Sequence, residues 1–535
     1  MSFMDNVPFP VLTFITFVPL GGVLLLLFLN RQSQDLLRWV ALIFMLADFV
    51  VSLYAYFLFD PSTSAMQLVE DHVWVSDWGI SYKMGIDGIS LFLVLLTTLL
   101  GPIVVLASWN DIKVRVKEFL ISLLFLQVGM LGVFVSLDLF LFYVFWEIML
   151  IPMYLLIGVW GNPARRLYAA IKFVLYTIVG SLLMLVAILA LYYTAGKAGG
   201  GYTFDLLRLY DFPVPLQAQF WMFLAFFLAF AIKVPMFPFH TWLPDAHTEA
   251  PTVGSVVLAA VLLKMGTYGF IRFAIPLFPN AAMDAAWWIC VLAVIGIIYG
   301  AWVAMVQDDV KRLVAFSSVS HLGFVMLGMF ALTVQGLEGS ILQMINHGLS
   351  TGALFLIVGM IYERRHTRMI SEFGGLSKVM PLFAVFFMAF TLSSIGLPGL
   401  NGFIGEFLIL LGTFRVHPWY AVLAASGVIF AAVYMLWMFQ RVMFGQITNP
   451  KNLGLNDLSA REVVVLLPIL VFVVWIGVYP NTFLKPMEPS VRNFIQQVET
   501  KRAAVVNIEK SKMYVNSHPD EKILASSAPA LTIDR

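Results

Sequence analysis

Cysteine and charged residues are both scarce in this sequence, and each scarcity excludes a kind of site or protein. Cys290 is the single cysteine among 535 residues, so the chain can form neither an internal disulfide nor a Cys-based zinc or iron–sulfur site. Charged residues make up 12% of the chain, against roughly 25% in soluble domains. No GxGxxG or P-loop pattern appears in a strand–helix context, and a net charge of +1 gives no reason to expect nucleic acid as a partner.

Long apolar runs account for most of the chain, since 61% of its residues are hydrophobic. A helix needs about 20 apolar residues to cross a bilayer, so we expect an all-α polytopic membrane protein with about 14 transmembrane helices. The first run is long and lacks a preceding basic cluster, which favours a span over a cleaved signal peptide. The predicted spans are 8–29, 36–58, 88–108, 117–135, 139–159, 167–194, 217–250, 252–274, 284–305, 310–331, 337–360, 381–413, 418–444 and 461–479.

Basic residues in the loops predict the orientation. They gather in the loops after the odd-numbered spans, which the positive-inside rule places in the cytoplasm. Both termini should then lie on the periplasmic side of a bacterial inner (cytoplasmic) membrane. Residues 68–84 alternate in polarity and predict a short hairpin on that outer side. The basic loop residues are Arg31, Arg38, Lys113, Arg115, Lys117, Arg165, Arg166, Lys311, Arg312, Arg364, Arg365, Arg368, Lys378, Arg441, Lys451 and Arg461.

Two predicted spans are interrupted by proline or glycine. The seventh contains Lys233 and Pro235 within AIKVPMFPFHTWLPDAHTEAP, and the twelfth contains Gly396 and Pro398 before Glu406. Such breaks in corresponding places indicate an internal repeat with discontinuous helices. Five spans separate the breaks, so the two repeats, spans 4–8 and 9–13, should be inverted. The alternative is that these residues give only kinks and close packing.

These breaks set the expected domain organisation. We expect N-terminal spans 1–3 with the outer hairpin loop at 1–116, a first antiporter-like repeat at 117–274, a second inverted repeat at 284–444, a final span at 445–480 and an outer-face tail at 481–535.

Ionisable side chains inside the predicted spans are the candidate functional residues. Each must face the bundle interior or water, because a charge in hydrocarbon costs at least about 2.5–3.5 kcal/mol. Burial favours a neutral lysine and a nearby carboxylate favours a charged one, so a lysine beside an acid could be switched between the two forms. The candidates for proton transfer are Glu147, Lys233, His240, Lys264, His321, His347 and Glu406.

Each candidate also has a structural alternative. Glu147 and Lys233 could form a static ion pair, and a buried histidine could simply join two helices by a hydrogen bond. His247 and His366 lie near predicted loops, so we expect both to be solvated.

Five motifs carry a family resemblance. They are FWEIMLIPMYLLIGVWG (145–161), KVPMFPFHTWLPDAHTEAPTVGSV (233–256), LLKMGTYGF (262–270), DDVKRLVAFSSVSHLGF (308–324) and GLPGLNGFIGEF (396–407). At these motifs the chain resembles the antiporter-like subunits of respiratory complex I, and most closely their chain-4 type. The resemblance extends from about residue 1 to 480, and the tail beyond about residue 490 does not align.

The resemblance implies a proton-translocating, non-redox membrane subunit of NADH:quinone oxidoreductase. Glu147 and Lys233 match the family's ion pair, Lys264 its central relay lysine and Glu406 its exit-side acid. His240, His321 and His347 match positions assigned to the proton path. No cofactor is expected in this chain, because FMN, iron–sulfur clusters and quinone belong to other subunits. The expected partners are other membrane-arm subunits, including chain-2-type and chain-5-type subunits, and the lipid bilayer.

Two other functions compete with this one. The first is a cation/proton antiporter subunit of the Mrp type, which would share the bundle without a redox partner. Glu406 argues against it. The family resemblance implies that Mrp-type, chain-2-type and chain-5-type subunits typically carry a lysine at the position of this glutamate. The second is a membrane scaffold whose buried charges only hold helices together.

Overall fold

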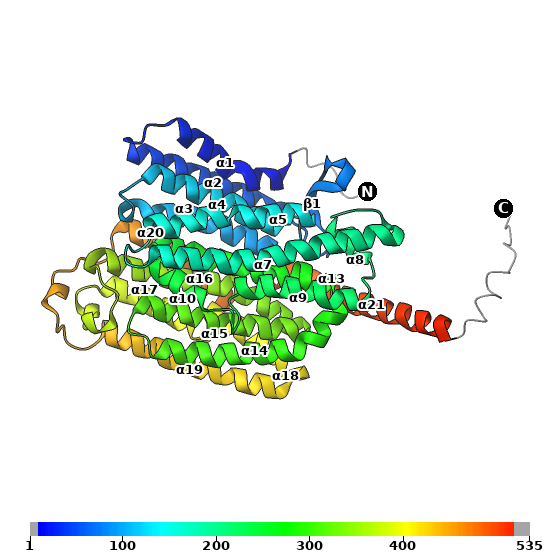
Figure 1. Ribbon diagram of the computed structural model, residues 1–535. Helices are drawn as coiled ribbons and strands as arrows, with labels where there is room; N and C mark the ends of the chain where they lie inside the picture. Colours follow the sequence, from blue (N-terminus) through cyan, green and yellow to red (C-terminus); the bar gives the residue numbers. More distant parts are fainter. Residues whose placement is uncertain (1–8, 518–535) are drawn as a thin grey trace.

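The apolar runs of the sequence become helices that lie side by side along one axis (Figure 1). The computed structural model describes residues 9–517, and within them thirteen helices are long and apolar enough to cross a membrane. The chain is therefore a multi-pass membrane protein. The predicted twelfth span is the exception to this length, because its break divides it into two shorter helices.

The helices alternate in direction between two ends of the bundle. The basic end carries the loops 112–115, 161–165 and 366–380, and the hairpin end carries the β-hairpin and α8 (Figure 1). Apart from the seventh, eighth and twelfth spans, the spans are α1 (Val11–Phe28), α2 (Gln34–Leu58), α3 (Leu91–Asp111), α4 (Val116–Val135), the single span made of α5 (Leu139–Ile148) and α6 (Leu150–Trp160), α7 (Arg166–Ala195), α14 (Pro279–Met305), α15 (Val310–Phe330), α16 (Val334–Arg365), α19 (Pro418–Met443) and α20 (Ala460–Val478).

The predicted hairpin is present as β1 (Gln67–Val75) and β2 (Ile80–Ile86), which pair antiparallel. Gly79 closes the turn with φ +63, a left-handed conformation that glycine adopts without strain. Lys83 Nζ lies 2.8 Å from Asp205 Oδ2, near α8 (Leu206–Asp211), and 3.0 Å from Asp71 Oδ2. Burial would lower the pKa of Lys83, but its hydrogen bonds to Asp205 and Asp71 outweigh burial and raise that pKa. The hairpin is thus fastened to the loops beside it.

The seventh span is broken where the prolines predict. The helix α9 (Leu216–Lys233) ends at the lysine, and α10 (Trp242–Glu249) resumes after eight residues. Met236 N donates to Ala231 O (2.9 Å), which leaves Ile232 O without its helical partner. Trp242 Nε1 donates to that carbonyl at 2.8 Å. The break is therefore buried in protein with a substitute donor, as backbone in hydrocarbon requires.

The twelfth span is broken as well, between α17 (Pro381–Ser394) and α18 (Asn401–Val416). Gly396 and Gly399 take φ +74 and +93 in the break, which favours glycine. Asn346 Nδ2, from α16, donates to Asn401 O at 2.8 Å. Both predicted breaks are confirmed, whereas the inverted repeats and the predicted domain boundaries remain predictions.

The eighth span is helical throughout but irregular. It comprises α11 (Thr252–Val257), α12 (Leu263–Gly269) and α13 (Ile275–Leu277), separated by π-helical turns at Leu258–Leu262 and Phe270–Ala274. Each π turn adds a residue to the helical ring and frees a backbone carbonyl. The sequence predicts a span at 252–274, and the structure adds two π turns within it.

The C-terminal tail begins at the hairpin end as α21 (Asn481–Ser517) (Figure 1). Gly88 N donates to Ser490 Oγ at 3.0 Å, and Lys501 Nζ donates to Leu209 O of α8 at 3.1 Å. The predicted tail is thus helical over this range, and residues 518–535 lie outside the described part.

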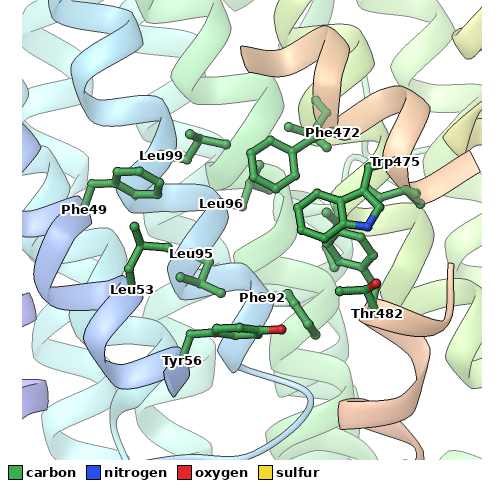
Figure 2. A pocket seen from close by; sticks show the side chains of 14 residues that line it. Phe49, Leu53, Tyr56, Phe92, Leu95, Leu96, Leu99, Phe472, Trp475 and Thr482 are labelled. Atoms are coloured by element: carbon green, nitrogen blue, oxygen red, sulfur yellow. The ribbon is translucent and has the colours of Figure 1, made fainter. Parts of the chain in front are cut away.

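An apolar cavity of about 130 Å³ lies between the N-terminal helices α2 and α3 and the C-terminal helix α20. Figure 2 shows Phe49 and Leu53 from α2 facing Phe472 and Trp475 from α20 across it, with Leu96 of α3 between them. Its lining is carbon apart from a few edge groups, so the cavity belongs to the lipid-facing packing and not to the polar interior.

Candidate functional site

Lys264 and His347 form the centre of a polar line through the bundle. Lys264 is fully buried, and its Nζ lies 2.6 Å from His347 Nδ1 on α16. The same Nζ donates to Ala259 O at 2.6 Å, a carbonyl within the π turn at Leu258–Leu262. The π turn therefore supplies a hydrogen-bond acceptor to a lysine that has no carboxylate partner among the described residues.

The line continues from His347 to Glu406. The rings of His347 and His321 are 5.8 Å apart between centroids and meet edge to face. His321 Nδ1 lies 3.0 Å from Glu406 Oε1, and Ser394 Oγ lies 3.2 Å from His321 Nε2. Gln343 Nε2 also donates to Glu406 Oε1 at 3.1 Å. Four of the seven predicted residues thus form one buried series, which we call the polar line: Lys264, His347, His321 and Glu406.

The second break positions Glu406. The carboxylate sits one turn into α18, and a Cβ added at Gly396 would come within 3.1 Å of Glu406 Oε2. A Cβ at Gly405 would meet the amides of Gln343 and Asn346 at 2.3 and 2.9 Å. Glycine at these two positions therefore lets α18 approach α16 and the break closely enough for Glu406 to reach His321.

Lys233 and Glu147 are near each other but not in contact. Lys233 is 1% exposed, with its Nζ 3.7 Å from Met149 Sδ and 5.4 Å from the ring centroids of Trp146 and Phe173. Glu147 is half-buried, and its Oε1 has no hydrogen-bond partner. The ion pairs of the described residues do not include one between these two side chains. The structure therefore shows the suspected pair separated, with the cation resting on aromatic rings.

Lys233 nevertheless lies against the helix that carries Lys264. A Cβ added at Gly266, two residues after Lys264, would stand 3.0 Å from Lys233 Cβ and 2.9 Å from Val234 N. The helices α9 and α12 therefore cross at Gly266 with backbone close to backbone, and the two buried lysines flank that crossing.

His240 lies in the first break, away from the polar line. It is 3% exposed, its Nδ1 is unpartnered, and its ring stacks on Phe237 (5.7 Å) and meets Tyr299 edge to face (5.1 Å). Nearby, Lys172 Nζ forms an ion pair with Asp245 Oδ2 at 2.7 Å. The structure thus places His240 in the break two residues before α10, and does not join it to the other histidines.

The expectation that His247 is solvated is wrong. The side chain is fully buried, stacks on Phe355 of α16 at 4.6 Å, and neither ring nitrogen has a hydrogen-bond partner. It lies within electrostatic range of Lys264 and of Lys311, whose Nζ donates to Ala250 O at 2.5 Å. The reason is that α10 packs inside the bundle after the break. His247 is therefore interior although it lies near a predicted loop in the sequence. His366 is exposed, as predicted.

The site is a set of proton donors and acceptors. Lysine, imidazole and carboxylate can each hold or release one proton, and the polar line offers four such groups in succession. Within residues 9–517, no three His, Cys, Asp or Glu side chains gather in a way that could hold a metal ion.

Comparison with known proteins identifies the family. Residues 136–444 match the family described as NADH:quinone oxidoreductase/Mrp antiporter, and residues 18–132 match the amino terminus of NADH-ubiquinone oxidoreductase chain 4. The NADH-quinone oxidoreductase subunit M of Rhodobacter capsulatus is 47% identical over 502 residues, covering 91% of this chain and 96% of that protein. The chain belongs to the subunit M family of NADH-quinone oxidoreductase.

Solved structures agree with membership in the subunit M family. A chain of respiratory complex I from Thermus thermophilus superposes with a TM-score of 0.82 at 34% identity, covering 91% of this chain and 99% of that one. A chain of the Mrp complex from Dietzia sp. superposes with a TM-score of 0.78 at 19% identity, covering 92% and 99%, and this likeness shows the fold alone. The family indicated by the motifs and the all-α membrane fold predicted from the apolar runs are both confirmed.

Proposed function

We propose that this membrane subunit of NADH-quinone oxidoreductase moves protons along the polar line. One observation carries the proposal, namely that four titratable side chains follow one another inside a buried bundle. The steps between them are 2.6 Å from Lys264 Nζ to His347 Nδ1, 5.8 Å between the two histidine rings, and 3.0 Å from His321 Nδ1 to Glu406 Oε1. Titratable groups at this depth are costly to bury, and proton transfer gives a reason for that cost.

The chemistry of the line is a series of proton exchanges. An ammonium at Lys264 donates to neutral His347, and transfer along that hydrogen bond leaves an amine and an imidazolium. His347 Nε2 is buried without a partner, so rotation of a ring or one intervening water can pass the proton to His321. His321 then protonates Glu406, whose carboxyl lies beside the break in the twelfth span and releases the proton toward the hairpin end.

Glu147 and Lys233 act as the switch in this proposal. In the separated state seen here, the nearest neighbours of Lys233 Nζ are a thioether and two aromatic rings, and no carboxylate of the described residues contacts the buried lysine. Movement of Glu147 toward the lysine would stabilise the ammonium. The close crossing of α9 and α12 at Gly266 gives such a movement a direct mechanical route to Lys264.

Proton uptake is assigned to the basic end. His247 lies within electrostatic range of both Lys311 and Lys264, and Arg368 forms a largely buried ion pair with Asp309 (3.2 Å) at the start of α15. His240 would serve as a side branch through the charged pair of Lys172 and Asp245.

The remainder of the proposal concerns the assembly. The chain would sit in a bacterial inner membrane with both termini periplasmic, as a non-redox translocase subunit beside chain-2-type and chain-5-type partners. FMN, iron–sulfur clusters and quinone in other subunits would supply the electron transfer that drives pumping. An Mrp-type antiporter is the alternative, and exchange of Na⁺ for H⁺ by vesicles without NADH would favour it.

Substitution of Lys264 by alanine tests the relay. The assembled complex is reconstituted in liposomes, and protons pumped are measured per NADH oxidised. We expect pumping to fall at least tenfold, since the line loses its central donor. Lys378→Ala, at the surface of the basic end, is the control and should pump normally. Assembled Lys264→Ala complex that pumped normally would leave only the scaffold function.

A further inference from the structure

A cavity of about 550 Å³ opens at the basic end, away from the polar line. It lies between the α3–α4 loop and the junction of α6 with α7. The side chains of Lys113, Arg115 and Arg166 line it together with Trp160 and one acid, Asp111. Nothing in the proton relay uses this cavity.

Two hydrogen bonds fix the walls of the cavity. Trp160 Nε1 donates to Val114 O at 2.8 Å, which ties the α3–α4 loop to the end of α6. Arg166 Nη1 donates to Val159 O at 2.7 Å, which ties the start of α7 to the same helix. Arg115 ends the loop at φ +52 immediately before α4 begins. The cavity is therefore built by the fold and not left by a loose surface loop.

The charge inside the cavity is unbalanced. Lys113 and Arg115 are exposed, and within the described part of the chain their side chains form no hydrogen bond or ion pair. Asp111 is the single acid of the lining against three cations. The cavity thus favours an anion, and guanidinium groups suit a phosphate in particular.

The two helices that form one side of the cavity also carry exposed apolar side chains. On α6, Ile151 is 66% exposed, and on α7, Leu167 and Ile171 are 61% and 50% exposed. Tryptophan and basic residues at a helix end mark the membrane interface. A ligand that fits both parts has a negative headgroup and hydrocarbon chains.

We propose that this cavity binds the phosphate headgroup of an anionic phospholipid, with its acyl chains along α6 and α7. The proposal does not depend on the proton relay. The occupant would lie at the end of the same span that carries Glu147, beyond the junction of α5 with α6 at Met149. Free phosphate shares the headgroup chemistry but gains nothing from the apolar side chains, which is why we assign a lipid.

The test measures lipid affinity of the purified complex by native mass spectrometry, with phosphatidylglycerol titrated after delipidation. The variant is Lys113→Gln/Arg115→Gln, which leaves Arg166 and its wall-forming hydrogen bond intact. Since each basic side chain near an anionic lipid surface raises affinity about fivefold, we expect the double variant to bind about 25-fold more weakly. The matched control is Arg312→Gln/Lys451→Gln, which removes two exposed cations from the same end and should bind normally.

Three outcomes would overturn the proposal. Equal affinity in the double variant and the control would show that the cavity is not the site. Equal affinity for phosphatidylcholine would show that the negative charge is not recognised. Displacement of phosphatidylglycerol by millimolar inorganic phosphate would assign the cavity to the free ion. The mass of the double-variant complex in the same spectra, equal to that of the unmodified complex apart from the substitutions, shows that the complex remained intact.

Discussion

The carboxylate of Glu406 is held by donors on two other helices. His321 Nδ1 is 3.0 Å and Gln343 Nε2 is 3.1 Å from Oε1. A substitution that changes the charge at position 406 must therefore change these contacts. Lys264 and His347 provide a precedent in the same chain, since a lysine there pairs with an imidazole at 2.6 Å. A lysine at position 406 could pair with His321 in the same way.

We expect Glu406→Lys to retain more proton pumping than Glu406→Ala, because lysine keeps a titratable group beside His321 and alanine removes it. Glu406→Gln keeps the hydrogen bonds but not the proton, so it should assemble normally and pump as poorly as alanine. The measurement is protons pumped per NADH oxidised in liposomes. Equal loss in the lysine and alanine variants would mean that the sign of the charge at this position matters.

Individual charged residues were predictable, but their pairing was not. Lys264 and Glu406 stand out in apolar runs, because a buried charge needs a function or a partner. The sequence could not show that His347 and His321 join them, since those contacts link helices distant in the chain. His247 was missed because its nearness to a loop in sequence says nothing about where α10 re-enters the bundle.

At the scale of helices, proline and glycine residues predict where the two spans break. They predict neither the contacts that surround the breaks nor the π turns of the eighth span. Both broken spans were predicted from residues such as Pro235 and Gly396. The π turns before and after α12 occur in a stretch, 252–274, that contains no proline, so proline, which marks both breaks, gives no sign of them. They depend on packing, and one of them supplies the Ala259 carbonyl to Lys264.

Trp242→Phe should destabilise the first break. The indole donates to Ile232 O, and phenylalanine would leave that buried carbonyl unpaired at a cost of about 1–3 kcal/mol. Thermal unfolding of the detergent-solubilised complex would show a lower melting temperature for this chain. Trp221→Phe is the control, since Trp221 is 69% exposed on the adjoining helix α9. An equal effect of both substitutions would contradict the assigned role of the indole.

Docking of α21 should depend on pH. Burial lowers the pKa of Lys501 from its ordinary 10.5 to about 7, and Asp211 opposes that shift. A released lysine therefore binds more protons between about pH 7 and 10.5, so docking strengthens as pH rises through this window, by at most about tenfold per unit. Hydrogen exchange of residues 481–507, corrected for its intrinsic rate, should slow from pH 7 to 8.5. Lys501→Met should abolish this dependence.

Over the whole molecule, the loops are divided by charge. Basic residues gather at the end that carries loops 112–115, 161–165 and 366–380, and the hairpin end is held by the acids Asp71 and Asp205 around Lys83. The sequence alone predicts this division of charge, because the prediction uses only the order of the spans and the basic residues of the loops between them. It predicts a single orientation, with the hairpin end outside.

The chain's one cysteine makes that orientation directly testable. Cys290 is buried, so cysteines introduced at exposed sites can be labelled without background from this chain. Val73, on the hairpin, is 77% exposed, and Val114, in a basic-end loop, is 70% exposed. A membrane-impermeant maleimide should label Val73→Cys in intact spheroplasts and Val114→Cys only in inverted vesicles, with the label read on this chain by gel shift. The reverse pattern would place the acidic hairpin inside, and the polar line would then release its protons to the cytoplasm.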